Sequence, residues 1–260
     1  MVRTYNSYLR IDELLGLQTP ASDGPEHDEM LFIIIHQVYE LWFKQVLHEA
    51  ELLRHSLTLG DAPQAHSAFK RILTIFKTLV AQVDVLETMT PVSFNSFRYR
   101  LDSASGFQSF QFRLFEYVLG HRRPEVLQWM PEGGEEMRRL LEERNRPSLY
   151  ASFLRFLSLN AYPIPADVLE RDPALPPAED ERVQKILVQV YREDPAGREI
   201  CERMVDLDEG LQEWRYRHVK MVQRTIGMKT GTGGSAGSEY LRSTLFKPLF
   251  PDLWTIRTSL

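Results

Sequence analysis

Two histidines on apolar helical faces are the residues of this sequence whose surroundings most favour chemistry. His218 shares a helical stripe with Trp214, and His36 lies close in sequence to Phe32 and Tyr39. Burying an imidazole costs free energy unless the ring gains a hydrogen bond or a metal. Each histidine alone could be a satisfied core residue. The pair, each surrounded by aromatic side chains, also suits a haem pocket, with one imidazole on the iron and the other on the opposite side.

An arginine and a threonine are further candidates for binding a ligand. Arg98 follows an aromatic cluster, where it could cap a helix, pair with Asp102, or grip a carboxylate through two parallel hydrogen bonds. Thr232 lies in residues 227–237, a segment with five of the fourteen glycines of the chain. Composition alone favours a surface linker there, and the functional alternative is a mobile loop that closes over a ligand.

Several common catalytic patterns are missing from the sequence. His48 and Glu49 begin a zinc-protease motif, but Leu52 stands where the second histidine should be. The paired Glu-x-x-His motifs of a di-iron bundle, the G-x-S-x-G elbow and the phosphate-binding G-x-x-x-x-G-K-[ST] loop are also absent. Cys201 is the single cysteine, which excludes a disulfide scaffold and a cysteine-based zinc cluster and suggests a reducing compartment.

The elements that must position these residues are helices. Apolar residues recur at helical spacing, and Gly60, Pro91 and Gly120 mark helix ends. The expected helices cover residues 26–59, 63–88, 93–101, 107–119, 135–144, 149–159, 181–192 and 196–226, with a loop at 162–179, where five prolines occur. We therefore predict an all-α, single-domain helical bundle over residues 1–260. The amphipathic N-terminal segment (residues 1–20) is set apart by a polar stretch, and we expect it to pack elsewhere in an assembly.

The composition narrows the possible partners. The 260 residues carry a formal charge of −5, which argues against a general nucleic-acid binder. The longest apolar run covers residues 30–35, far short of the ~20 residues of a membrane span. The first residues lack the apolar core of a signal peptide. We expect a cytoplasmic protein that binds neither nucleic acid nor membrane.

Taken together, the motifs resemble those of the tryptophan 2,3-dioxygenase family, tetrameric haem enzymes that open the indole ring of L-tryptophan. The matching stretches occur in family order along the whole chain. They are YNSYLRIDELL near the start, EHDEMLFIIIHQVYELWFKQ at 26–45, SGFQSFQFR at 105–113, WRYRHVKMVQRTIGMKTGTGGSAG at 214–237, and the closing FPDLWTIRTSL.

The resemblance implies a role for each candidate residue. It makes His218 the axial ligand of the iron of haem b and His36 the distal histidine, which orients the indole N–H. It places Arg98 on the substrate carboxylate and Thr232 on the ammonium and carboxylate end. Three groups of residues complete the implied site: Phe32 and Phe94 on the indole pocket, Tyr5, Tyr8 and Leu9 on the pocket of a neighbouring subunit, and Ser105, Gly106 and Val222 against the haem.

The activity implied is addition of both atoms of O2 across the pyrrole double bond of L-tryptophan, which gives N-formylkynurenine in a homotetrameric enzyme. The loop departs from the family at Ala236, where a second serine is usual. A related haem monooxygenase that forms an oxindole from tryptophan or a methylated tryptophan is therefore the alternative. A haem-binding sensor is a third possibility, although a sensor has no need of the amino-acid clamp that Arg98 and Thr232 would form.

Overall fold

The computed structural model describes residues 2–24, 26–102, 104, 106–130, 132–229, 231 and 241–260, apart from the side chains of Phe107 and Trp129. Within these residues the regular structure is entirely helical, and the predicted all-α class is confirmed. The α-helices are α1 (Tyr5–Leu9), α2 (Ile11–Leu15), α3 (Asp28–Leu59), α4 (Ala62–Leu86), α5 (Pro91–Phe97), α6 (Phe110–Leu119), α7 (Glu135–Arg144), α8 (Leu149–Leu159), α9 (Ala166–Leu169), α10 (Glu181–Glu193), α11 (Pro195–Ile226) and α13 (Pro251–Thr255). The 3-10 helices are η1 (Arg98–Leu101), η2 (Gly106–Gln108), η3 (Pro124–Trp129) and η4 (Ile256–Ser259).

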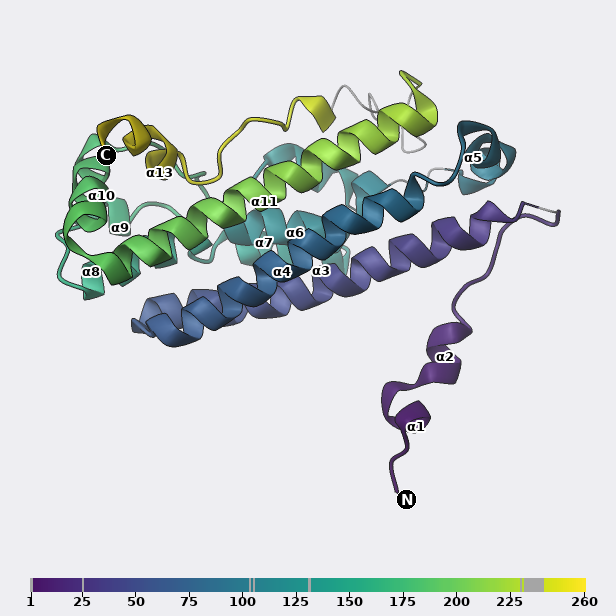
Figure 1. The fold of residues 1–260 in the computed structure, drawn as a ribbon, viewed down its shortest axis with the longest axis horizontal. Helices are drawn as coiled ribbons and strands as arrows, with labels where there is room; N and C mark the ends of the chain where they lie inside the picture. The colour runs from purple at the N-terminus through teal and green to yellow at the C-terminus, as the bar shows by residue number, and fades with distance from the viewer. Residues whose placement is uncertain are drawn as a thin grey trace.

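Three long helices, α3, α4 and α11, run side by side and form the frame of the molecule (Figure 1). Local sequence signals set their ends. Gly60 ends α3 with a left-handed φ of 76°, and the side chain of Asp61 then accepts a hydrogen bond from the backbone N–H of Gln64 to begin α4. Asp194 caps α11 in the same way, with Pro195 in the first turn. Helices α3 and α11 reach 32 residues each, and they carry His36 and His218 respectively.

The largest apolar core joins α3, α4, α6, α8, α10 and α11. Its fully buried side chains include Leu53, Phe69, Phe76, Phe153 and Leu207. A second cluster fills the other end of the frame, where α3, α4 and α11 meet α5. Removing this apolar area from water is the main stabilising contribution to such a bundle, at about 25 cal/mol per Å².

The structure refines several predicted boundaries. The proline-rich segment 162–179, predicted as a loop, contains one short helix, α9, and helix also forms at 251–259, where none was predicted. The helix expected over 93–101 divides into α5 and η1, and the one expected at 107–119 begins at Phe110 because Ser109 caps it by accepting from the Phe112 N–H. Short helices were not predicted because four or five residues show too little hydrophobic periodicity. No helix within the described residues is long and apolar enough to cross a bilayer.

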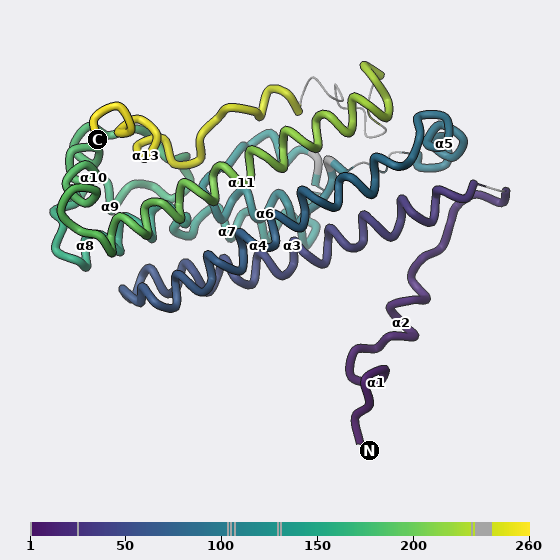
Figure 2. The backbone as a smooth tube through the Cα atoms, in the orientation of Figure 1, coloured from purple at the N-terminus to yellow at the C-terminus, as the bar shows by residue number. Residues whose placement is uncertain are grey.

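The N-terminal segment leaves the body of the molecule, as Figure 2 shows. Helices α1 and α2 contain no buried residue, and the apolar side chains of Tyr5, Tyr8, Leu15 and Leu17 are all exposed. Such an apolar surface is unusual for a segment that remains in water. This segment, the N-terminal arm, therefore leaves its apolar side chains uncovered by the rest of its own chain.

Candidate functional site

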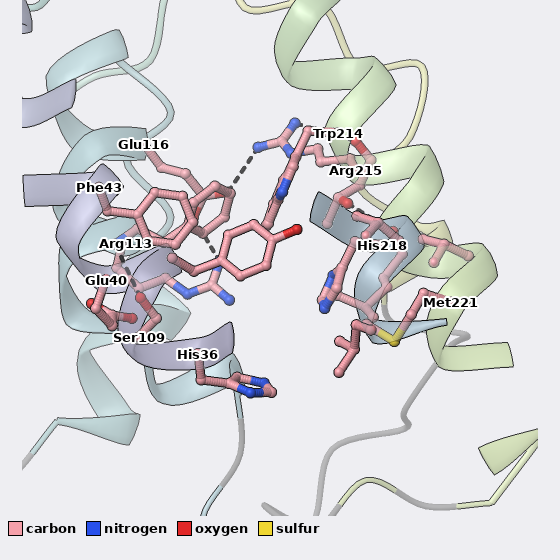
Figure 3. Close-up of a pocket in the computed structure, with 18 residues that line it drawn as sticks. His36, Glu40, Phe43, Ser109, Arg113, Glu116, Trp214, Arg215, His218 and Met221 are labelled. Carbon is pink, nitrogen blue, oxygen red and sulfur yellow. Dashed lines mark hydrogen bonds and ion pairs between the residues drawn. The ribbon is translucent and has the colours of Figure 1, made fainter. Parts of the chain in front are cut away.

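A cavity of about 890 Å³, counting its part open to solvent, lies between α3, α4, α6 and α11. Both histidines singled out from the sequence line it, and Figure 3 shows His36 on α3 and His218 on α11 around the same space. They are 182 positions apart in the chain (218 − 36), so only the packing of α3 near α11 brings them together.

His218 is held as a neutral imidazole. Its ring stacks on Trp214, one turn earlier in α11, with a centroid distance of 5.2 Å and an interplanar angle of 10°. Burial, reinforced by the nearby His36 and Arg113, lowers the pKa of His218 to about 4. Within the described part of the chain no hydrogen bond to this imidazole is formed. A neutral ring nitrogen that faces a cavity is the form in which histidine binds a metal.

His36 is oriented by its own helix. Its Nδ1 lies 2.7 Å from the Phe32 carbonyl oxygen, which can only accept, so Nδ1 carries the proton and Nε2 keeps a lone pair. Burial lowers the pKa of His36, outweighing the hydrogen bond to Phe32 and the nearby carboxylate of Glu40, which both raise it. The His36 ring is thus a neutral hydrogen-bond acceptor.

Aromatic rings pack beside His36. The Phe32 ring lies 4.1 Å from the His36 ring and 5.7 Å from the Phe94 ring, measured between centroids. Phe97 packs against both phenylalanines, and Val222 contacts the same apolar cluster from α11. Phe32, Phe94 and Val222 therefore gather next to His36, although they do not line the cavity themselves.

One end of the cavity is cationic. The buried carboxylate of Glu116 forms ion pairs with Arg113, Arg123 and Arg215 at 2.7–2.8 Å. Burial by itself raises the pKa of Glu116, but the three guanidinium charges outweigh it and lower the pKa to about 2. Glu116, Arg113 and Arg215 line the cavity. Three guanidinium groups therefore meet the Glu116 carboxylate at this end of the cavity, where they could also bind an anionic group of a ligand.

The remaining predicted residues fall in different places. Gly106 lines the cavity, and a Cβ added there would meet nothing within 4 Å, so the backbone borders open space. Arg98 begins η1, directly after Phe97, and does not line the cavity. Tyr5, Tyr8 and Leu9 are on the exposed arm, away from the cavity of their own chain. Ser105 and Thr232 lie outside the described residues.

Most of the residues that line the cavity were not predicted from the sequence. They lie on α3, α4, α6 and α11, at the N-cap of α6, and at positions 241 and 244. They are Tyr39, Glu40, Phe43, Val83, Leu86, Ser109, Phe112, Arg113, Glu116, Trp214, Arg215, Val219, Met221, Leu241 and Thr244. Counting three, four and seven positions onward from His36 along its helix identifies Tyr39, Glu40 and Phe43. No local signal indicated α4, whose contribution depends on helix packing.

The fold and the site define an all-helical protein with an internal cavity between two neutral histidines and a cationic end. Comparison with known proteins makes the assignment specific. The tryptophan 2,3-dioxygenase family model matches residues 2–151 and 179–260, and the chain belongs to this family.

Relatives from several bacteria agree along the whole chain. The chain is 59% identical to the tryptophan 2,3-dioxygenase of Herpetosiphon aurantiacus, with 99% of this chain and 98% of the relative covered. It is 56% identical to the enzyme of that name from Anaeromyxobacter dehalogenans (99% and 96% covered) and 40% identical to that from Bacillus thuringiensis (99% and 92% covered).

Proposed function

We propose that this protein is a haem-dependent dioxygenase that adds both atoms of O2 across the indole pyrrole double bond of L-tryptophan and forms N-formylkynurenine. The observation that carries the proposal is the pair of neutral histidines on one cavity, in a chain of the tryptophan 2,3-dioxygenase family. This reaction is the first step of tryptophan degradation by the kynurenine pathway.

The residues of the cavity suit haem b. Within the described residues, no group of three or more His, Cys, Asp or Glu side chains could hold a metal ion alone. An ion bound to His218 therefore needs ligands from elsewhere, as a porphyrin supplies. The open space at Gly106 leaves room for a flat ring, and Arg113 and Arg215 would face the two propionates.

When bound, ferrous haem supplies the position at which dioxygen binds and is activated. The protein positions the substrate. The free Nε2 lone pair of His36 accepts a hydrogen bond from the indole N–H and orients the ring. Phe32 and Phe94 provide an aromatic wall, Arg98 holds the carboxylate and Thr232 the ammonium group. The neutral imidazole of His36 acts as a hydrogen-bond acceptor. Because an indole N–H is a very weak acid, the reaction does not need His36 to remove that proton.

Incubation with ¹⁸O2 tests the reaction directly. We expect the product from L-tryptophan to gain two heavy oxygen atoms, since both atoms of dioxygen enter it. Mass spectrometry of the product is the measurement. A gain of one heavy atom would instead support the oxindole-forming monooxygenase, and absence of turnover together with an unchanged ferrous Soret band at millimolar tryptophan would support a haem-binding sensor.

Replacing Arg98 by leucine is expected to weaken use of tryptophan. Loss of one partner of a desolvated charge pair costs about 2–5 kcal/mol, so kcat/KM should fall roughly 30-fold or more. Steady-state kinetics with tryptophan and with tryptamine, which lacks the carboxylate, measure the effect. The matched control is Arg100→Leu, two residues away, where the arginine pairs with the exposed Asp23. Equal losses with both substrates would show that Arg98 does not bind the carboxylate.

The N-terminal arm supports a homotetramer in which Tyr5, Tyr8 and Leu9 complete the pocket of a neighbouring subunit. Deleting the first ten residues is expected to reduce activity strongly while the unfolding temperature changes by only a few degrees, because α1 and α2 bury no residue within their own chain. Activity, thermal unfolding and sedimentation velocity are measured on the same preparation. A truncated protein with full activity would refute this role of the arm.

A further inference from the structure

Helix α11 holds the chain segment that returns along it through side chains on one face. Asp208 Oδ2 accepts from the backbone N–H groups of Leu249 and Phe250 at 2.7 and 3.3 Å. Gln212 Nε2 donates to the Lys247 carbonyl at 2.8 Å, and Arg215 Nη1 donates to the Thr244 carbonyl at 3.4 Å. The partner numbers fall as the helix numbers rise, so the segment runs antiparallel to α11. Positions 208, 212 and 215 are spaced by four and three, which places them on one helical face.

The two ends of this returning segment (residues 241–250) are held differently. Leu249 and Phe250 are buried in the main core, and Trp254 Nε1 also donates to Asp208 at 2.9 Å. At the other end, Leu241 and Thr244 line the cavity that contains both histidines. Thus one end is fixed by the core, while the hydrogen bonds of Gln212 and Arg215 hold the stretch leading to the cavity.

The stretch between these two hydrogen bonds is strained. Phe246 has a φ of 59°, in the left-handed region that disfavours a residue with a bulky side chain, and 90% of its surface is exposed. Its side chain therefore gains little packing to offset the cost. A strained residue persists only where its surroundings over-determine the backbone. Here the contacts of Thr244 and Lys247, on either side of Phe246, provide that constraint.

We propose that Gln212 is a positioning residue for the cavity, which acts with Arg215 to hold residues 244–247 against α11 and so fixes the wall made by Leu241 and Thr244. Gln212 does not line the cavity, and its effect is transmitted through the backbone that it binds. Arg215 has two roles, because the same guanidinium also pairs with Glu116 at 2.7 Å. Gln212 is therefore the residue at which positioning can be tested separately from the charge cluster.

The test is Gln212→Met in the full-length holoprotein, which keeps the length of the side chain and removes its donor. Hydrogen-exchange mass spectrometry should show the amides of 241–247 exchanging about 2- to 12-fold faster, the factor for one lost hydrogen bond. Amides in the middle of α3 and α4 should be unaffected. Gln189→Met is the matched control, since Gln189 donates to the exposed Glu193 on the outer helix α10. Unchanged exchange at 241–247 would overturn the proposal.

Two further variants separate positioning from general destabilisation. Gln212→Lys restores a donor within reach of the Lys247 carbonyl and should return exchange toward the wild-type rate. Phe246→Asn places a residue that tolerates the left-handed region at the strained position, so it should reduce the effect of Gln212→Met when the two are combined. The proposal would be overturned if residues 241–247 exchange as fast in Gln212→Lys as in Gln212→Met, and the double variant Gln212→Met/Phe246→Asn exchanges no more slowly than Gln212→Met alone.

The consequence for ligand binding rests on the proposed function. In Gln212→Met, the tryptophan concentration that half-saturates the ferrous Soret change should rise by a similar 2- to 12-fold, with kcat within about twofold. A shift no larger than that of Gln189→Met would overturn the link between this wall and the substrate. If the wild-type protein itself shows no response to tryptophan, the proposed function fails, and the exchange measurement still decides the role of Gln212.

Discussion

The His218→Ala protein is expected to be purified with little haem and to show no measurable oxidation of tryptophan. The imidazole of His218 lines the cavity from α11, and its low pKa, about 4, keeps it neutral and able to bind iron throughout the physiological range. Replacing a residue that only hydrogen-bonds to a metal ligand lowers metal affinity or activity by about 10- to 100-fold. Replacing the ligand itself should lower the affinity for haem by more than that. Haem content per chain and the ferrous Soret spectrum measure the effect.

The matched control is His55→Ala, which removes an exposed histidine from α3 and should leave haem content unchanged. Added imidazole, which fits the space left by the side chain, should restore part of the Soret band of His218→Ala but leave that of His55→Ala as it was. A His218→Ala protein with normal haem content and activity would show that another residue binds the iron, and the proposed arrangement would be wrong.

The Glu116→Gln protein is expected to lose about 3–5 kcal/mol of folding stability at neutral pH. Glu116 is 1% exposed and is the counter-ion of three arginines. Arg113 lies on α6, Arg123 follows α6, and Arg215 lies on α11, so the ion pairs connect α6 to α11. Removing one partner of a buried ion pair leaves uncompensated buried charge, which costs an amount of that order. Urea unfolding at pH 7 measures it. Glu135→Gln, at an exposed pair with Arg138, should leave the free energy of unfolding almost unchanged.

The same carboxylate gives a pH signature. Its pKa is about 2 in the folded protein against an ordinary value of 4.5, so the unfolded chain takes up this proton first as pH falls. The stabilisation is therefore complete above pH 4.5 and is lost progressively between pH 4.5 and 2. The free energy of unfolding should fall more steeply with acid in the wild type than in Glu116→Gln over that window. Parallel curves would refute the assignment of this titration to Glu116.

The fold was largely predictable because its helices are long and amphipathic. The two ranges 135–144 and 149–159 coincide with α7 and α8, and the predicted end of the first long helix at Leu59 coincides with that of α3. Capping residues such as Asp61 and Asp194 act within a few positions of the chain, so local sequence contains the information. The short helices α9 and α13 were missed because four or five residues show no periodic pattern.

The site was predictable where an unusual residue stood on a helical stripe, as at His36 and His218. It was not predictable at the cationic end. Arg113 and Arg215 are 102 positions apart (215 − 113), and nothing in either local pattern indicates that both meet Glu116. The positions of Val83 and Leu86 on the cavity wall were also unpredictable, because an apolar residue on a helix can face either a core or a cavity.

The sequence by itself determined the helices, the two imidazoles that required a partner, and the family. The tertiary structure alone decided that these imidazoles share one cavity, that three arginines converge on one carboxylate beside it, and that Gln212 and Arg215 hold its returning wall. The reason is physical: helix formation and capping depend on neighbours within about four positions, whereas a cavity and its charges depend on how helices distant in the chain pack against one another.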